Sequence, residues 1–176
     1  MEFTAPGDRP EPKFRKTKPH MLPFCIVVDR REKAPYCFRG IPAPMRLGGG
    51  FFVVPTQWQT LKTGDYSIAG FEHRFCVERK SIADLFGTLA GARDRFEKEH
   101  ERMSQMDFAA VVVESTWEEI AKGNGTRMSP ESVLNTAASW SVRYGVHWIA
   151  VDGRSAGERM TLRLARAFFK KAAETE

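Results

Sequence analysis

The sequence predicts an α/β domain, with a mixed central sheet flanked by helices. Residues 24–28 and 108–114 are nearly continuous apolar runs, which are typical of strands buried on both faces. Strand-like and helix-like segments alternate over the second half of the chain, after a first half rich in strand-like segments. This order favours one sheet covered by helices. A chain of 176 residues is long enough for one such domain with a sizeable core.

The first 23 residues are predicted to form a flexible arm, and residues 24–176 the folded domain. The arm contains five of the ten prolines and few side chains that a core could bury. Its five Lys and Arg residues could contact a polyanion, although a solvated tail is the favoured interpretation.

A β-hairpin is predicted near the middle of the chain. Residues 60–68 and 74–80 alternate between apolar and polar side chains on either side of Gly70. Ser81 then offers an N-cap for a helix, with Asp84 three residues later in a pattern similar to a capping box. The other elements are expected as follows: strands at residues 51–54, 57–62 and 147–151, and helices at residues 92–107, 117–122, 129–144 and 155–173.

Two carboxylates and a lysine are predicted to meet at the hairpin. Side chains two apart on a strand share a face, so Glu78 and Lys80 point the same way. The hairpin can bring Asp65 beside Glu78. Carboxylate oxygens hold a hard cation, the cation lowers the pKa of a bound water, and the ammonium stabilises hydroxide or developing phosphate charge. The pattern therefore indicates hydrolysis of a phosphodiester with Mg²⁺ or Mn²⁺.

The alternative for these residues is a solvated strand edge, because an acidic residue followed by Glu-x-Lys is a weak signal by itself. Charged residues are unusually dense here: Asp65, Glu78, Arg79, Lys80 and Asp84 lie within twenty residues, beside apolar strand positions. Buried charges are costly unless they are paired or bound to metal. The density favours a functional site.

The string GDY at residues 64–66, followed by VERKSIADL at residues 77–85, resembles the nuclease signature of the xeroderma pigmentosum group F (XPF) family. Residues 26–32 are similar to that family's opening strand, which ends in Asp-x-Arg-Glu. The resemblance runs, with gaps, from about Phe24 to about Phe169. It is closest to the small single-domain members of bacteria and their phages. It implies a restriction-endonuclease-like fold with a PD-(D/E)XK nuclease core.

The resemblance also implies a catalytic set. Asp65 and Glu78, joined by Asp29, are expected to bind Mg²⁺ or Mn²⁺. Lys80 is expected to position the attacking water. Arg79 and Asp84 complete the set, with Arg79 bracing Asp84 or Asp29; for Asp84, helix capping is an equally favoured and compatible role.

Three further residues are expected to support the site or to contact DNA. Arg31 and Glu32 follow Asp29, although a salt-bridged turn explains the same residues. Arg95 matches the arginine that follows the motif in the family. Glu99 stands where the family usually has glutamine, which departs from the family pattern without affecting the expected metal site.

Composition limits the partners that we expect. A net charge of +5 fits a polyanion such as DNA without proving one. We expect no membrane partner, because no apolar run approaches the length of a membrane span. We also expect no nucleotide cofactor. Cys25, Cys37 and Cys76 are odd in number and far apart, so neither a zinc site nor a disulfide framework is predicted. The expected compartment is the reducing cytoplasm of a bacterial cell or phage-infected host.

The function expected from the resemblance is metal-dependent DNA endonuclease activity on branched DNA, such as flaps, forks and 3' overhangs, in repair or recombination. Two alternatives stay open: a non-catalytic DNA-binding module, and a nuclease of the same fold acting in restriction or in four-way junction resolution. The first is disfavoured because all the charged positions of the motif are present.

A homodimer, or pairing with a partner subunit, is also expected. Apolar residues of the last helix occupy more than one helical face, which predicts an apolar patch beyond the core: Met160, Leu162, Leu164, Ala165, Phe168 and Phe169. The alternative is that Leu164 and Phe168 face the core and Phe169 is a single exposed apolar residue. The aromatic residues Trp140, Tyr144 and Trp148 are expected in the core rather than as a platform for stacking bases.

Overall fold

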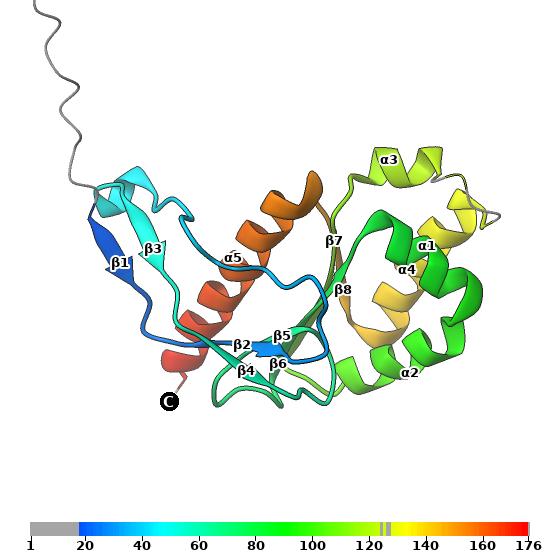
Figure 1. Cartoon of the computed structure of the whole chain (residues 1–176). Coiled ribbons are helices and arrows are strands. Elements are labelled where there is room, and N and C mark those ends of the chain that lie inside the picture. Colours follow the sequence, from blue (N-terminus) through cyan, green and yellow to red (C-terminus); the bar gives the residue numbers. More distant parts are fainter. Residues whose placement is uncertain (1–17, 124, 126–127, 176) are drawn as a thin grey trace, which may run out of the picture.

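The computed structural model describes residues 18–123, 125 and 128–175. Its centre is a six-stranded sheet in the order β4-β2-β5-β6-β7-β8 (Figure 1). Strand β5 is antiparallel to β2 and β6, and the other neighbouring pairs are parallel, so the predicted mixed sheet is confirmed. The strands are β2 (Ile26–Asp29), β4 (Thr56–Gln59), β5 (Tyr66–Ile68), β6 (Phe75–Lys80), β7 (Phe108–Val113) and β8 (His147–Ala150).

Helices cover both faces of this sheet (Figure 1). The long helix α5 (Gly153–Ala173) packs on one face, and helices α1 (Ile82–Gly91), α2 (Arg93–Met103) and α4 (Pro130–Tyr144) pack on the other. Strand β7 shows why its sequence is apolar throughout: Ala110 and Val112 face the α5 core, while Val111 and Val113 face the opposite core. Helix α3 (Trp117–Lys122) follows β7.

A second, two-stranded sheet lies beside the main one and contains β1 (Pro19–Met21) and β3 (Phe51–Val53), with the 3₁₀ turn η1 (Met45–Leu47) between them in sequence. Residues 1–17 of the predicted arm lie outside the described residues. The rest of that arm is structured, because β1 pairs with β3 and Leu22 is buried in the core. Gly50 permits the pairing, since a Cβ there would collide with the carbonyl of Lys18.

The predicted hairpin is confirmed, with Tyr66 of β5 paired to Val77 of β6. Its first strand is shorter than expected, because the chain from Thr60 to Asp65 is a loop and the strand begins at Tyr66. Gly64 has φ of 73°, a left-handed conformation that interrupts the extended chain. The prediction of a strand over residues 60–65 was therefore wrong, and the loop instead delivers Asp65 to the start of β5.

Most apolar residues of the last helix pack against the protein core. Leu162, Ala165 and Phe168 are buried in the core. Phe169 also packs inward, with its ring centroid 5.0 Å from that of Phe24, and it contacts Phe71. The prediction of an apolar patch left over on the last helix was therefore wrong, because Met160 and Leu164 also pack against the core.

The prediction for the aromatic residues holds for Trp140, which is buried against Phe96 and His100 on the α2 side of the sheet. Trp148 and Tyr144 pack against the same core. Across the part of the chain that the structure describes, no helix combines the length and apolar character needed to cross a bilayer.

Candidate active site

Asp65 and Glu78 lie side by side where β5 begins and β6 ends. The antiparallel pairing of Tyr66 with Val77 puts the preceding Asp65 opposite the following Glu78. The backbone N–H of Asp65 donates to the Val77 carbonyl over 2.9 Å, and the Arg79 N–H donates to Asp65 Oδ2 over 2.8 Å. Glu78 is 5% exposed. The structure thus brings together the two carboxylates that the sequence predicts to meet.

The electrostatics of this pair favour a bound cation. Burial raises the pKa of Asp65, and the negative charge of Glu78 raises it further. Burial also raises the pKa of Glu78, against the opposing effect of Lys80. Two carboxyls that resist ionisation in this way are stabilised as carboxylates only when a positive charge lies between them.

Lys80 supplies one positive charge on the same face of β6, as predicted. Its Nζ lies 2.6 Å from Glu78 Oε1 and 4.8 Å from the ring centroid of Phe96. Burial alone would lower the pKa of Lys80, but the adjacent Glu78 carboxylate outweighs burial and raises it. The side chain is therefore a fixed ammonium at neutral pH.

Arg79 points to the opposite face and joins two acidic residues distant in sequence. Its Nη1 lies 2.9 Å from Glu114 Oε2, and its Nη2 lies 3.3 Å from Glu32 Oε1. The expectation that Arg79 braces Asp84 or Asp29 was wrong. Glu32 does reach the site as expected, where its charge acts on both Asp65 and Glu78.

Glu114 is a site residue that the sequence reasoning missed. It directly follows β7, which is parallel to β6 and in register with it, Lys80 lying opposite Val113. The carboxyl ends of adjacent parallel strands lie at one edge of a sheet, which is where ligands of open α/β sheets bind. The sequence did contain a signal for Glu114, because this acidic residue directly follows an apolar run that predicts a buried strand.

Asp29 is engaged in positioning contacts with Arg31 and Leu61. Its carboxylate accepts hydrogen bonds from the N–H, Nε and Nη2 of Arg31 and from the Leu61 N–H, between 2.7 and 2.9 Å. Four donors occupy the lone-pair positions of one carboxylate. Burial would raise the pKa of Asp29, but these hydrogen bonds hold it below its ordinary value. These contacts form the salt-bridged turn that was the alternative for this segment, and the expected metal role of Asp29 stays a prediction.

Asp84 and Arg95 are not brought to the carboxylates. Asp84 is exposed and forms the predicted helix cap: its N–H donates to Ser81 Oγ over 3.1 Å, and the Ser81 hydroxyl donates to Asp84 Oδ2. Arg95 is exposed on α2, and its side chain forms no hydrogen bond with the described part of the chain. The structure therefore supports the capping role of Asp84, and its expected catalytic role, which is compatible with capping, stays a prediction.

Glu99 is the second residue whose place the sequence reasoning missed. Its Oε1 lies 3.4 Å from the Gly64 N–H and from Thr63 Oγ1, both in the loop that delivers Asp65. The negative charge of Glu99 helps to raise the pKa of Glu78. The residue that departs from the family pattern is thus adjacent to the carboxylates.

The donor set fits a hard divalent cation. Among the described residues, Asp65 Oδ1 and Glu78 Oε2 accept no hydrogen bond, so each carboxylate keeps an oxygen for a metal. No group of three or more His, Cys, Asp and Glu side chains with metal-binding geometry occurs in those residues. Mg²⁺ is commonly bound by only one or two carboxylates, with water and substrate phosphate completing its octahedron. Two free oxygens beside an ammonium match that mode of binding.

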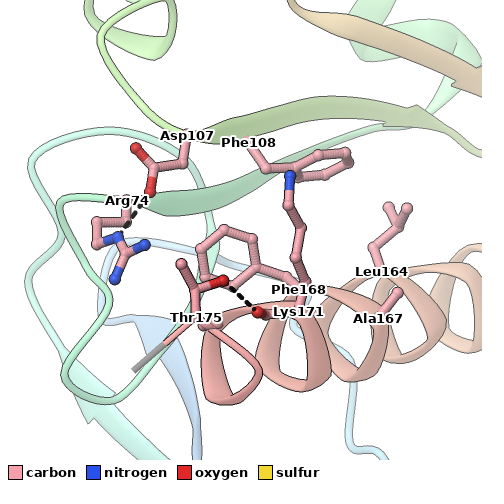
Figure 2. A pocket seen from close by; sticks show the side chains of 9 residues that line it. Arg74, Asp107, Phe108, Leu164, Ala167, Phe168, Lys171 and Thr175 are labelled. Carbon is pink, nitrogen blue, oxygen red and sulfur yellow. Dashed lines mark hydrogen bonds and ion pairs between the residues drawn. The ribbon is translucent and has the colours of Figure 1, made fainter.

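A pocket of about 340 Å³ lies elsewhere, at the amino ends of β6 and β7 (Figure 2). Arg74 and Asp107, which precede those strands, form an ion pair of 2.6 Å at its rim. Phe108 and Phe168 give it an apolar wall. Asp65 and Glu78 lie at the opposite ends of the strands, so this pocket is not part of the candidate site.

The chain matches one protein family and is similar to solved structures of an archaeal protein. The ERCC4 domain family matches residues 28–164, more than half of the chain. The solved structure of XPF from Aeropyrum pernix is similar with a TM-score of 0.58 and 21% identity, covering 81% of this chain and 60% of that one. The same archaeal protein in complex with DNA gives a TM-score of 0.57 and 21% identity, covering 84% of this chain and 66% of that one.

The chain thus spans about three-fifths to two-thirds of the structures that it resembles. No curated protein gives a significant match. The structural likeness confirms the restriction-endonuclease-like fold expected from the sequence. The family match covers both carboxylates, Lys80 and the strand that ends beside Glu114, and the chain belongs to the ERCC4 domain family.

Proposed function

We propose that this protein is an endonuclease that hydrolyses phosphodiester bonds in DNA, with Mg²⁺ or Mn²⁺ held by Asp65 and Glu78. The observation that carries the proposal is the pair of carboxylates, the half-buried Asp65 and the buried Glu78, with Lys80 Nζ 2.6 Å from Glu78. Membership of the ERCC4 domain family supports nuclease chemistry. A solved structure of similar fold is described as a complex with DNA, which supports DNA as the substrate.

Asp65 and Lys80 have different roles in the proposed reaction. Asp65 is oriented by the Arg79 N–H, which leaves its other oxygen for the metal. Lys80 is held by Glu78 and Phe96, so its ammonium can orient an attacking water and stabilise charge on the phosphate. When bound, the cation would lower the pKa of a coordinated water and neutralise phosphate oxygens.

The proposed substrate is branched DNA, as in the family that the motif resembles, with roles in repair or recombination. The discriminating experiment is a cleavage assay on flap, fork, four-way junction, duplex and single-stranded DNA, with Mg²⁺, Mn²⁺ or EDTA. Cleavage confined to four-way junctions or to plain duplex would favour junction resolution or restriction instead. DNA that is bound but left intact with both metals would identify a non-catalytic binding module.

Substitution of the site residues tests the chemistry directly. Asp65→Asn, Glu78→Gln and Lys80→Ala are each expected to lower cleavage with Mg²⁺ at least about a hundredfold, because each removes a metal ligand or the ammonium. DNA binding in EDTA should change little. Asp94→Asn, which alters an exposed carboxylate in the first turn of α2, is the matched control and should cleave normally. Full activity of Glu78→Gln would refute the assignment.

A homodimer, or pairing with a partner subunit, forms part of the proposal. Its support comes from the β8 edge of the sheet rather than from Phe169. Strand β8 pairs only with β7, so its outer side is open within the described chain. On the adjacent helix α4, Val142 is 89% exposed, and the exposed Ala138 lies one turn before it. An apolar helix face beside an open strand edge is typical of a surface that pairs with another chain.

A further inference from the structure

Four arginines line one hollow between helix α5 and the segment that contains η1. Arg159, Arg163 and Arg166 belong to α5, and Arg46 belongs to η1 on the opposite wall. The hollow encloses about 400 Å³, and among the described residues no acidic side chain lines it. The remaining lining residues give it an apolar surface: Ile41, Pro42, Ala43, Pro44, Phe52 and Leu162.

The four arginines place several positive charges close together on ordered elements of the fold. Positions 159, 163 and 166 lie on neighbouring turns of one helical face, where like charges destabilise a helix. The guanidinium of Arg166 lies 4.2 Å from the ring centroid of Phe52, which fixes its orientation. Burial, together with the charge of Arg46, lowers the pKa of Arg166. An anion in the hollow would relieve this repulsion.

Five other arginines of the chain are paired with carboxylates. Arg31 pairs with Asp29, Arg74 with Asp107, and Arg143 with Glu97, and Arg79 and Arg154 both pair with Glu114. Within residues 18–123, 125 and 128–175, the four arginines of the hollow form no ion pair. The cluster is therefore not a structural ion-pair network, and a negatively charged ligand is the partner that its chemistry fits.

We propose that this hollow binds successive phosphates of a nucleic-acid backbone, at a site separate from the catalytic carboxylates. The planar guanidinium fork matches two phosphate oxygens at once. Arg159 and Arg166 are separated by about 10 Å along the helix axis, which is enough to reach more than one phosphate of a strand. A row of this length suits a chain of phosphates better than one free phosphate or mononucleotide.

Helix α5 connects the hollow to the catalytic end of the sheet. Arg154, in its first turn, lies 3.6 Å from Glu114, which in turn pairs with Arg79. Arg163 lies about 14 Å further along the helix axis. The hollow therefore holds backbone a few base pairs from the carboxylates. The inference rests on the proposed function in one respect, that nucleic acid is the ligand.

The test compares two double variants of the full chain by fluorescence anisotropy with a labelled DNA fork in EDTA, so that cleavage plays no part. Arg46→Gln/Arg163→Gln removes two exposed charges from the hollow and leaves the Arg166–Phe52 contact intact. Lys170→Gln/Lys171→Gln removes the same net charge from the last turn of α5. Circular dichroism and thermal melting establish that both variants fold.

We expect the hollow variant to bind DNA at least about tenfold more weakly than the lysine control, with the salt slope reduced by about 0.9 for each phosphate that the variant no longer neutralises. Equal affinities and salt slopes for the two variants would overturn the proposal. A calorimetric titration with dAMP and inorganic phosphate distinguishes the source of the phosphate. Micromolar binding of dAMP that disappears in the hollow variant would identify a free nucleotide as the ligand and overturn the backbone assignment.

The two proposals can fail independently. Binding through the hollow without cleavage in Mg²⁺ would refute the nuclease proposal alone. Cleavage with normal affinity in the hollow variant would refute only the second phosphate site.

Discussion

At the scale of single residues, the position of Glu78 beside Asp65 lowers the stability of the fold and favours binding of a cation. It is 5% exposed and faces Asp65, whose pKa is raised by burial and by Glu78 itself. Lys80 offsets part of this repulsion through a contact of 2.6 Å. Arg79 pairs with Glu32, and the one ammonium of Lys80 cannot neutralise both carboxylates together with Glu99, whose charge also acts on Glu78. The excess negative charge provides the affinity for a cation.

A stability prediction follows for Asp65→Asn in the absence of metal. The folded-state pKa of Asp65 lies above its ordinary value of 3.8, so its stabilising contribution is complete below about pH 4 and is lost as pH rises through the raised pKa. The asparagine side chain carries no such penalty and keeps an oxygen for the Arg79 N–H. Chemical denaturation should show that, between pH 5 and pH 8, the free energy of unfolding of the variant rises relative to that of the wild type by at least about 1 kcal/mol.

Saturating Mg²⁺ provides the internal control for that experiment. A ligand that binds only the folded protein stabilises it increasingly as its concentration rises above Kd. Mg²⁺ should therefore raise the melting temperature of the wild type and have little effect on the variant. A difference between the two proteins that is independent of both pH and Mg²⁺ would contradict a carboxylate pair at this position.

At the scale of elements, Asp29 connects the end of β2 to the loop before β5. Its carboxylate holds the Leu61 N–H, Arg31 Nη2 reaches the Leu61 carbonyl over 2.6 Å, and the Asp29 N–H bonds the Asp65 carbonyl over 2.8 Å. These three hydrogen bonds therefore position the backbone that carries Asp65. A residue with this role should affect stability first and metal affinity only indirectly.

Asp29→Asn tests that distinction. The pKa of Asp29 lies below its ordinary value of 3.8, so the carboxylate stabilises the fold above that pH and the stabilisation is lost on acidification. Replacing it should cost roughly 1–3 kcal/mol at pH 7, because Arg31 and the Leu61 N–H lose their charged acceptor. Mg²⁺ affinity, measured by calorimetry, should stay within about threefold once the protein is folded. A loss of Mg²⁺ binding equal to that of Asp65→Asn would identify Asp29 as a ligand.

Features encoded over short distances were predictable from the sequence. Alternation around Gly70 predicted the hairpin, and Ser81 with Asp84 predicted the helix cap, because both depend on residues a few positions apart. The partners of Arg79 lie 35 and 47 residues away, so no local pattern could identify them. The hollow depends on η1 meeting α5, more than a hundred residues apart. For Asp29, the family pattern predicted a metal ligand and the local sequence a salt-bridged turn, and the structure shows the contacts of the turn.

At the scale of the whole molecule, two functional regions flank one sheet. The carboxylates and Lys80 face the helices α1 and α2, while Arg79 and the arginine hollow belong to the α5 side. Glu114 joins the two regions through Arg79 and Arg154. DNA that contacts both would pass around the carboxyl edge of the sheet, which leaves the β8 edge free for a second chain.

The oligomeric state is therefore predicted to depend on α4 and β8. Val142→Glu places a charge on the most exposed large apolar side chain of the described residues, at a position outside the core of the monomer. Sedimentation equilibrium at micromolar concentration should show a dimer for the wild type and a monomer for this variant. Phe169→Glu should instead lower the melting temperature, because Phe169 packs against Phe24 and Phe71. A wild-type monomer that cleaves branched DNA at full rate would rule out the need for a second subunit.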